Sequence, residues 1–163
     1  MAINELLLNE FDSECANTKK TIERVPEAKW DWKPHSKSGS IGWLAGHVAT
    51  LPRFAVVAIN STEFEIEGGD NPKVTKFAEL LPAFEKYRKE AREAIAKVTD
   101  EELKVIWTLK WKGQTLFAMP RYAVVRSFCF NHIIHHRAQL TMYLRALDIP
   151  VPALYGPSAD EQM

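Results

Sequence analysis

Residues 131–139 read NHIIHHRAQ and hold three of the five histidines in this 163-residue chain. The segment around them is predicted to be a long helix. Residues three or four positions apart then share one helix face, with Cβ atoms roughly 5–6 Å apart. His132 can therefore bind one metal ion together with either His135 or His136, and the spacing leaves that choice open.

Two imidazoles at this spacing need a third ligand from another part of the chain. His47 lies within residues 42–48, GWLAGHV, in the apolar centre of a second predicted helix. A single histidine on an apolar helix face is usually a core residue with its own hydrogen bonds. Burying three imidazoles without partners is costly, however, so the combination favours a shared metal ion.

Other side chains near the two helical histidines are weaker candidates. Cys129 would be a soft metal ligand as a thiolate, but it is interpreted as a small apolar core residue. Gln139 is predicted either to hydrogen-bond a ligand or bound water or to lie at the rim of the site. Gln139 and Tyr143 are the two candidates for positioning an incoming substrate. One helical stripe, predicted to face the interior, contains Val125, Cys129, His132, His136, Gln139 and Tyr143.

Composition places the chain among soluble globular proteins and predicts one domain, residues 1–163. Apolar residues make up 46% and charged residues 26%, with 21 basic and 21 acidic side chains. The basic residues are not clustered as they are in nucleic-acid-binding proteins, so we expect no nucleic-acid partner. Two distant cysteines, Cys15 and Cys129, indicate a reducing compartment rather than a disulfide framework. Without a visible signal peptide or an apolar run of roughly 20 residues, we expect a cytoplasmic protein with no membrane partner.

The hydrophobic periodicity predicts an all-α fold, a four-helix bundle with a short β-hairpin between the third and fourth helices. Ser40 is expected to cap the start of the second helix, and Pro52 is expected to kink it. Thr99 is expected to begin a capping box with Glu102. The four tryptophans at positions 30, 32, 107 and 111 are interpreted as packing residues rather than pocket walls. The predicted segments are helices at Ile3–Arg24, Ile41–Ile59, Thr75–Val98 and Pro120–Leu147, a polar loop at Gly68–Pro72, and a hairpin at Trp107–Phe117.

The order of these motifs resembles the DinB/YfiT-like superfamily of three-histidine metalloenzymes. The likeness covers nearly the whole chain: SIGWLAGH at residues 40–47, HIIHHRAQ at residues 132–139, LRALDIPVP at residues 144–152, and YGPS at residues 155–158. Two positions depart from the family pattern, because Ala138 and Asp148 stand where the family usually has glycine. Because Asp148 stands at this position, the sequence does not predict which type of C-terminal cap ends the last helix.

The resemblance implies a four-helix bundle in which His47, His132 and His136 bind one divalent ion, with His135 outside the ligand set. Zinc is the first expectation for the ion, with nickel or iron as alternatives. Family members with known chemistry are similar to thiol-dependent transferases and isomerases. The resemblance also implies a homodimer.

We therefore expect a metal-dependent enzyme that activates a small-molecule thiol or water for attack on an electrophilic substrate. No HExxH, Gly-x-Ser-x-Gly or glycine-rich phosphate motif accompanies the histidines. The alternatives are a non-catalytic, metal-binding stress- or DNA-damage-inducible protein, and a helical interaction module in which the histidines are incidental.

Overall fold

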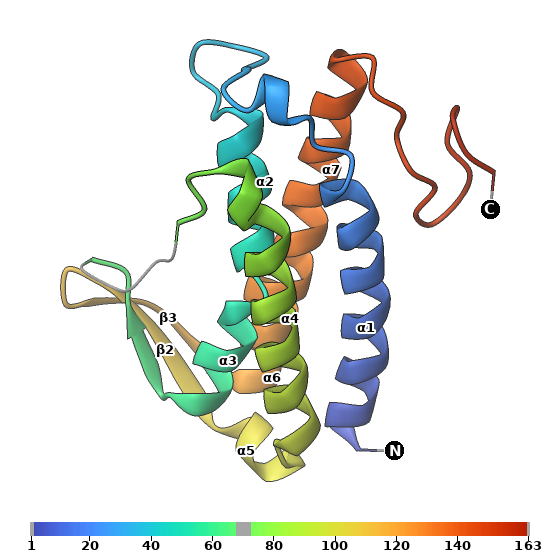
Figure 1. Ribbon diagram of the computed structural model, residues 1–163. Helices are drawn as coiled ribbons and strands as arrows, with labels where there is room; N and C mark the ends of the chain where they lie inside the picture. The colour runs from blue at the N-terminus through green and yellow to red at the C-terminus, as the bar shows by residue number, and fades with distance from the viewer. Residues whose placement is uncertain (1, 68–72, 163) are drawn as a thin grey trace.

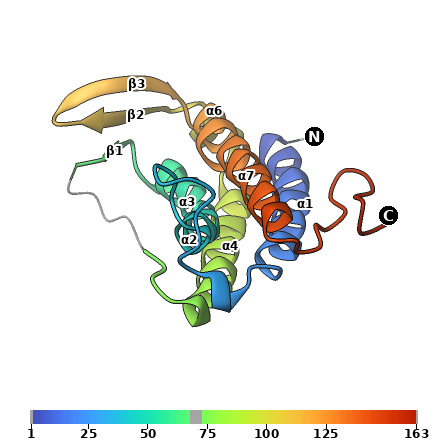
Figure 2. The same ribbon diagram turned by 90° about the horizontal axis from the view of Figure 1, so that it is seen from above.

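The computed structural model describes residues 2–67 and 73–162. Long helices lie side by side, and a small sheet projects from one side of them (Figures 1 and 2). The prediction of a mostly helical fold is confirmed, while the predicted loop Gly68–Pro72 lies outside the described residues. The helices are α1 (Ile3–Ile22), α2 (Ile41–Thr50), α3 (Arg53–Asn60), α4 (Leu80–Lys97), α5 (Asp100–Lys104), α6 (Arg121–Val124) and α7 (His132–Ala146). The strands are β1 (Glu63–Glu65), β2 (Ile106–Trp111) and β3 (Gln114–Pro120).

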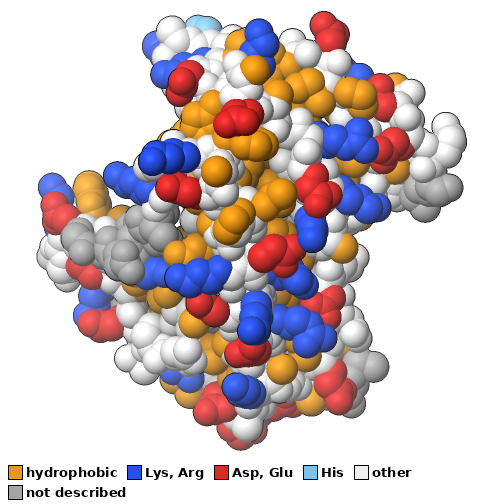
Figure 3. Space-filling view, viewed as in Figure 1, with side chains coloured by type: hydrophobic (Ala, Val, Ile, Leu, Met, Phe, Trp, Pro, Cys, Tyr) orange, Lys and Arg blue, Asp and Glu red, His pale blue; other side chains and the backbone are white. Residues whose placement is uncertain are grey.

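Helices α1 and α4 pack along most of their length, because each buries an apolar stripe at helical spacing. Ion pairs join their solvent edges: Lys19 Nζ lies 2.8 Å from Glu85 Oε1, and Arg92 Nε lies 2.9 Å from Asp12 Oδ1. On this face of the molecule, acidic and basic side chains are interspersed (Figure 3). The buried core between the helices includes Leu7, Phe11, Cys15, Ile22, Phe84, Ala91, Ile95 and Phe130.

The predicted second helix is two helices rather than one kinked helix. Ser40 caps α2 as predicted, since its Oγ accepts the backbone N–H of Trp43 at 3.1 Å. The helix ends at Thr50, and α3 begins at Arg53, because Pro52 has no N–H with which to continue the ladder. The break fixes the direction of α2, the helix that carries His47.

The segment Ile41–Asn60 is long and apolar enough, by length and composition, to cross a membrane. In this structure, however, 67% of its most apolar window is buried. Both of its helices pack against α4, and α2 also packs against α7. This burial is typical of a core helix, whose apolar surface is covered by protein rather than lipid.

The third long helix begins later than predicted. Residues Phe77–Glu79 form a turn of 3₁₀-helix, and α4 starts at Leu80, so Pro82 falls in the first turn, where a missing N–H costs nothing. The predicted capping box at α5 is confirmed: Thr99 N–H donates to Glu102 Oε2 at 2.8 Å, and Glu102 N–H donates to Thr99 Oγ1 at 3.2 Å.

The β structure is larger than the predicted hairpin. Strands β2 and β3 pair antiparallel, and the turn between them uses Lys112 at φ 50° and Gly113 at φ 72°. Positive φ at both turn residues matches the right-handed twist of the strands. The additional strand β1 pairs parallel with β2, with Glu63 opposite Thr108. The sheet order is β1-β2-β3.

The predicted fourth helix is interrupted by a π-helical segment, Val125–Asn131, which joins α6 to α7. A π-helix closes i→i+5 hydrogen bonds and so uses more residues per turn than an α-helix. The face that points into the core therefore shifts along the sequence. The buried residues of this helical run are Val124, Val125, Cys129, Phe130, Ile133, Arg137, Leu140 and Leu144.

This shift corrects the predicted interior stripe. Its first members, Val125 and Cys129, are buried as expected, but the later members turn toward the surface. His132, His136 and Tyr143 are only partly buried, and Gln139 is exposed. The two histidines therefore lie at the border between core and solvent, where a ligand can reach them.

The C-terminal cap of α7 is a Schellman motif formed around Asp148. Ile149 N–H donates to the Leu144 carbonyl at 3.0 Å, and Asp148 N–H donates to the Arg145 carbonyl at 3.0 Å. Asp148 has φ 55°, the left-handed conformation that usually requires glycine. The aspartate thus occupies the left-handed position of this cap, where glycine is the usual residue.

Candidate metal centre

Three imidazoles from two helices meet beside the break between α2 and α3. His47 is contributed by α2, and His132 and His136 by the first two turns of α7. Among the described residues, these three form a group able to hold a metal ion, because their ligand atoms all lie within 4.8 Å of one another. The ring centroids of His132 and His136 are 4.7 Å apart, as are those of His47 and His136.

The donor set fits a single divalent ion. A tetrahedral zinc with Zn–N bonds of about 2.0–2.1 Å places its ligand nitrogens about 3.4 Å apart. The Nε2 atoms of His47 and His132 are 3.4 Å apart. Imidazole suits zinc, copper, iron and nickel, and three protein ligands leave a position open for water or substrate.

Two of the three rings are oriented through their other nitrogen. The Nδ1–H of His136 donates to Oε1 of Gln139 at 2.7 Å. The ring of His132 hydrogen-bonds to the backbone carbonyl of Phe128, in the π-helical segment one turn earlier. Histidines that bind metals typically donate their second N–H to a carbonyl or carboxylate, which fixes the tautomer and frees the facing nitrogen for the ion.

The electrostatic environment keeps the cluster neutral. Burial lowers the pKa of His47 to about 4, and the neighbouring His136 and His132 add to this effect. Burial is also the largest cause of the lowered pKa values of His132 and His136. Neutral imidazole is the form that binds a metal ion, so at pH 7 an ion meets little competition from protons.

An exposed tryptophan stacks on one of these rings, a feature that the sequence analysis missed. The ring planes of Trp43 and His47 are nearly parallel, at 10°, with centroids 5.5 Å apart. Trp43 is nevertheless 57% exposed. The available signal was the spacing of four residues on one helix, which places both side chains on the same face.

The cluster opens onto solvent through more than one pocket. His47 lines a pocket of about 490 Å³ together with Trp30, Trp43 and Lys73. His136 lines a second pocket of about 410 Å³, whose lining also includes Trp43. Sites for small molecules commonly have volumes in this range, so each pocket is large enough to bring a reactant to the histidines.

The candidate positioning residues, Gln139 and Tyr143, both line the second pocket. Gln139 is engaged by His136, as described above. The Tyr143 hydroxyl donates to the Gly39 carbonyl at 3.5 Å, and its ring packs edge-on against Trp32 at 5.7 Å. Gln139 therefore orients a histidine, and Tyr143 forms part of the pocket wall.

Two side chains near the cluster lie outside it. His135 is exposed, and its ring centroid lies 4.8 Å from that of His136, but it is not part of the three-histidine group. Cys129 is fully buried, and burial raises the pKa of its thiol well above the usual value. Its Sγ contacts the Pro52 carbonyl at 3.9 Å, in keeping with its interpretation as a core residue.

A buried ion pair next to the cluster holds α7 against α1. Arg137 is 1% exposed, and its Nη2 donates to the Glu14 carboxylate at 2.6 Å. Its Nη1 donates to the Glu14 carbonyl at 2.9 Å and to Thr18 Oγ1 at 3.1 Å. Tyr155, in the C-terminal tail, donates to the same carboxylate at 2.7 Å. These bonds fix the rotation of α7 and, through it, the direction of His136.

The fold and the cluster together define a helical protein with a three-histidine group able to hold a metal ion. A model of the DinB superfamily matches residues 10–140. The chain therefore belongs to the DinB superfamily, as the sequence motifs predicted.

The relatives of this chain agree with that assignment. The chain is 22% identical over 162 residues to the uncharacterized protein YrdA of Bacillus subtilis (strain 168), covering 94% of this chain and 89% of that protein. A DinB-like protein from Bacillus cereus ATCC 10987 superposes with a TM-score of 0.73 at 24% identity, covering 93% of this chain and 97% of the other. The DinB-like protein YjoA of Bacillus subtilis gives 0.70 at 19% identity, covering 90% and 96%. These structural likenesses show a shared fold.

Proposed function

We propose that this protein is a metal-dependent enzyme in which His47, His132 and His136 bind one divalent ion, with zinc as the first candidate and nickel or iron as alternatives. When bound, the ion would lower the pKa of a coordinated small-molecule thiol or water and so supply a nucleophile near neutral pH. The thiol sulfur or the water oxygen would form a bond to the electrophile, with loss of its own proton and of any leaving group that the electrophile carries. The fold proposed for this function is a four-helix bundle of the DinB type.

The convergence of three neutral imidazoles is the observation that supports this proposal. A hydrogen bond between His47 and His132 would account for the 3.4 Å contact between those two rings. It would not account for the third ring, His136, which bonds to Gln139 through its Nδ1 and belongs to the same three-histidine group. A shared ion accounts for all three rings at once.

The surroundings of the cluster favour a catalytic ion over a purely structural one. A structural zinc site is usually closed by four protein ligands, whereas a catalytic site keeps one position open. In the part of the chain that the structure describes, the ligand group contains three residues. Two pockets, one lined by His47 and one by His136, reach the same three-histidine cluster. Such an arrangement suits a reaction between two small molecules, here a thiol and an electrophile.

Two further parts of the proposal concern the location of the protein in the cell and its oligomeric state. We propose a cytoplasmic location, supported by two free cysteines that are both buried and by the reducing compartment such thiols indicate. We also propose that the protein works as a homodimer, as the family resemblance implies.

The proposal is tested by measuring conjugation of 1-chloro-2,4-dinitrobenzene with cysteine, glutathione or coenzyme A. The protein is assayed after zinc reconstitution, after metal removal, and as the variants His136→Ala and His35→Ala. We expect conjugation with at least one thiol in the reconstituted protein, its loss without metal and in His136→Ala, and its retention in His35→Ala, because His35 is an exposed loop residue. Equal rates with and without metal, or in His136→Ala and native protein, would show that the ion is not catalytic.

A further inference from the structure

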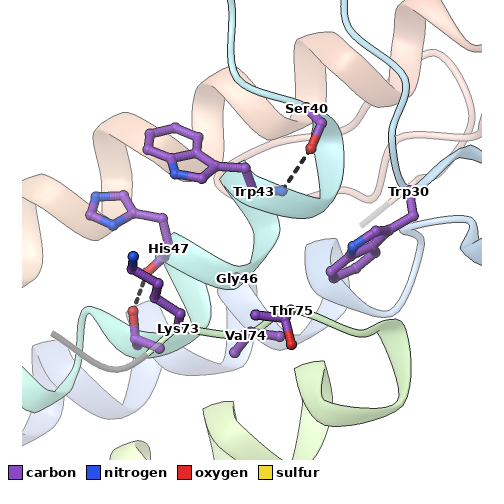
Figure 4. A pocket seen from close by; sticks show the side chains of 9 residues that line it. Trp30, Ser40, Trp43, Gly46, His47, Lys73, Val74 and Thr75 are labelled. Atoms are coloured by element: carbon purple, nitrogen blue, oxygen red, sulfur yellow. Dashed lines mark hydrogen bonds between the residues drawn. The ribbon is translucent and has the colours of Figure 1, made fainter.

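The pocket lined by His47 has walls formed by two indoles. Trp43 stacks on His47 and is 57% exposed, while Trp30 packs edge-on against Phe77, with ring centroids 6.1 Å apart. The two indoles flank the first turns of α2, Trp43 on the side of His47 and Trp30 on the opposite side (Figure 4). The lining of this pocket therefore includes one indole on each side of the helix.

Three glycines allow this wall to form. A Cβ on Gly39 would lie 2.4 Å from the Trp43 ring, and a Cβ on Gly42 would lie 2.4 Å from the Trp30 ring. A Cβ on Gly46 would meet Val74 at 3.0 Å. The glycines thus let both indoles, and the segment that begins at Lys73, approach the backbone around α2 closely.

The charge of the pocket favours an anion. Among the described residues that line it, Lys73 bears the one formal charge, and none has a carboxylate. In Figure 4 the Lys73 side chain reaches toward the His47 imidazole. The hydroxyl-bearing residues Ser40, Thr50 and Thr75 supply the other polar side chains of the lining. Among the described lining residues an anionic group therefore finds one cation and no carboxylate, while the Glu79 carboxylate just outside the lining accepts the Thr75 hydroxyl at 3.4 Å.

The pocket borders the three-histidine group through His47. Its volume of about 490 Å³ suits a small molecule rather than a peptide or a polymer. His47, a member of the three-histidine group, is part of its lining. A ligand held by the indoles and Lys73 would therefore present one of its atoms to the cluster.

We propose that this pocket binds a small carboxylate with a planar, aromatic or conjugated ring, and that such a compound is the electrophilic substrate. The ring would pack against the indoles, whose flat faces favour stacked or edge-on contacts. The carboxylate would pair with Lys73. The binding step stands on the pocket alone, whereas its description as a substrate site rests on the proposed function.

The test measures binding by calorimetry to metal-free and zinc-loaded protein. The probes are 1-naphthoate, the neutral 1-naphthalenemethanol and the non-planar anion cyclohexanecarboxylate. Metal-free protein should bind 1-naphthoate more tightly than either of the other two, because only naphthoate has both a flat ring and a charge. The metal-free arm separates binding by the pocket from coordination of a carboxylate to zinc.

Variants separate the two contributions. Trp43→Leu should weaken naphthoate binding about fivefold, and Trp43→Phe should restore most of it. Lys73→Met should weaken naphthoate about two- to fivefold and leave binding of the alcohol unchanged. The matched controls are Trp111→Leu and Lys76→Met, which remove a tryptophan and a lysine from exposed positions outside the pocket lining. Both controls should bind naphthoate as tightly as the native protein does.

The outcomes distinguish this inference from the proposed function. If naphthoate binds no better than cyclohexanecarboxylate, or if Trp43→Leu and Lys73→Met bind it as native protein does, the pocket inference is wrong even when zinc binds stoichiometrically. If naphthoate binding depends on both residues but the protein takes up no metal, the pocket inference stands and the metal-dependent function fails.

Discussion

The hydrogen bond from His136 Nδ1 to Gln139 Oε1 predicts that an exposed residue outside the ligand set controls metal affinity. We consider the substitution Gln139→Leu, which keeps a side chain of similar size and removes the acceptor. His136 would then lose the 2.7 Å bond that fixes its tautomer and ring orientation. Removing such a partner typically costs 10- to 100-fold in metal affinity, or about 1.4–2.7 kcal/mol of binding free energy.

The same substitution should leave the fold intact. Gln139 is exposed on α7, and surface substitutions of this kind usually change the free energy of unfolding by less than about 0.5 kcal/mol. Zinc affinity is measured by competition with a chromophoric chelator, and stability is measured by urea unfolding of the metal-free protein. Gln114→Leu, on the exposed strand β3, is the matched control and should bind zinc as native protein does.

A conservative variant sharpens this test. In Gln139→Glu the carboxylate can accept the same Nδ1–H, and carboxylate partners increase the basicity of a ligating histidine. We expect zinc affinity equal to or higher than that of native protein. The reasoning is refuted if Gln139→Leu binds zinc as tightly as native protein, or if Gln139→Glu and Gln139→Leu lose affinity equally.

Three further predictions concern stability. Because the pKa of His47 is about 4 in the folded protein and about 6.5 in an unfolded chain, the unfolded chain binds more protons between these values. Urea unfolding of metal-free protein should therefore show stability falling as pH drops from 6.5 toward 4, less steeply in His47→Gln. Arg137→Met should cost about 3–5 kcal/mol in urea unfolding, because Glu14 keeps a buried charge without its cation, and the double variant Glu14→Leu/Arg137→Met should recover much of this loss. Asp148→Gly should raise the free energy of unfolding by up to about 1 kcal/mol in the same assay, because glycine adopts φ 55° without steric cost.

Each of these has an outcome that contradicts it. An equal acid slope in native protein and His47→Gln would show that this histidine does not titrate between the two states as described. A loss below about 1 kcal/mol in Arg137→Met would mean that water reaches Glu14 and screens it. A less stable Asp148→Gly variant would show that contacts of the aspartate outweigh the backbone strain.

Much of the fold was readable from the sequence because long apolar stripes have an unambiguous period. The capping box at Thr99 and the cap at Ser40 depend on local side-chain hydrogen bonds and were also predicted correctly. Strand β1 was missed because three residues, Glu63–Glu65, are too short to show a period, and their pairing partner lies more than forty residues away.

The π-helical segment was the main obstacle to predicting the surroundings of the site. Nothing in the composition of Val125–Asn131 distinguishes it from an α-helix, since it contains neither proline nor glycine. Extending one α-helical period through it placed the histidines on the buried face. The true buried face is one residue further along and includes Arg137, whose burial depends on a carboxylate from the distant Glu14.

The choice of histidines illustrates what spacing can and cannot predict. Intervals of three and four residues both return to one helix face, so the sequence alone left His135 and His136 equivalent. The family resemblance selected His136, and the structure places His136 in the three-histidine group and His135 outside it. Trp43 was overlooked although its four-residue distance from His47 was visible, because tryptophans more often pack in cores than line pockets.

The central claim is that three histidines hold one metal ion, and metal stoichiometry after zinc reconstitution and gel filtration tests it most directly. We predict one zinc ion per chain in native protein and in His135→Ala, and a large loss of bound zinc in His47→Ala, the variant that removes the ligand from α2. If native protein retains no stoichiometric zinc, nickel or iron, or if His47→Ala retains as much metal as His135→Ala, the account of this site is wrong.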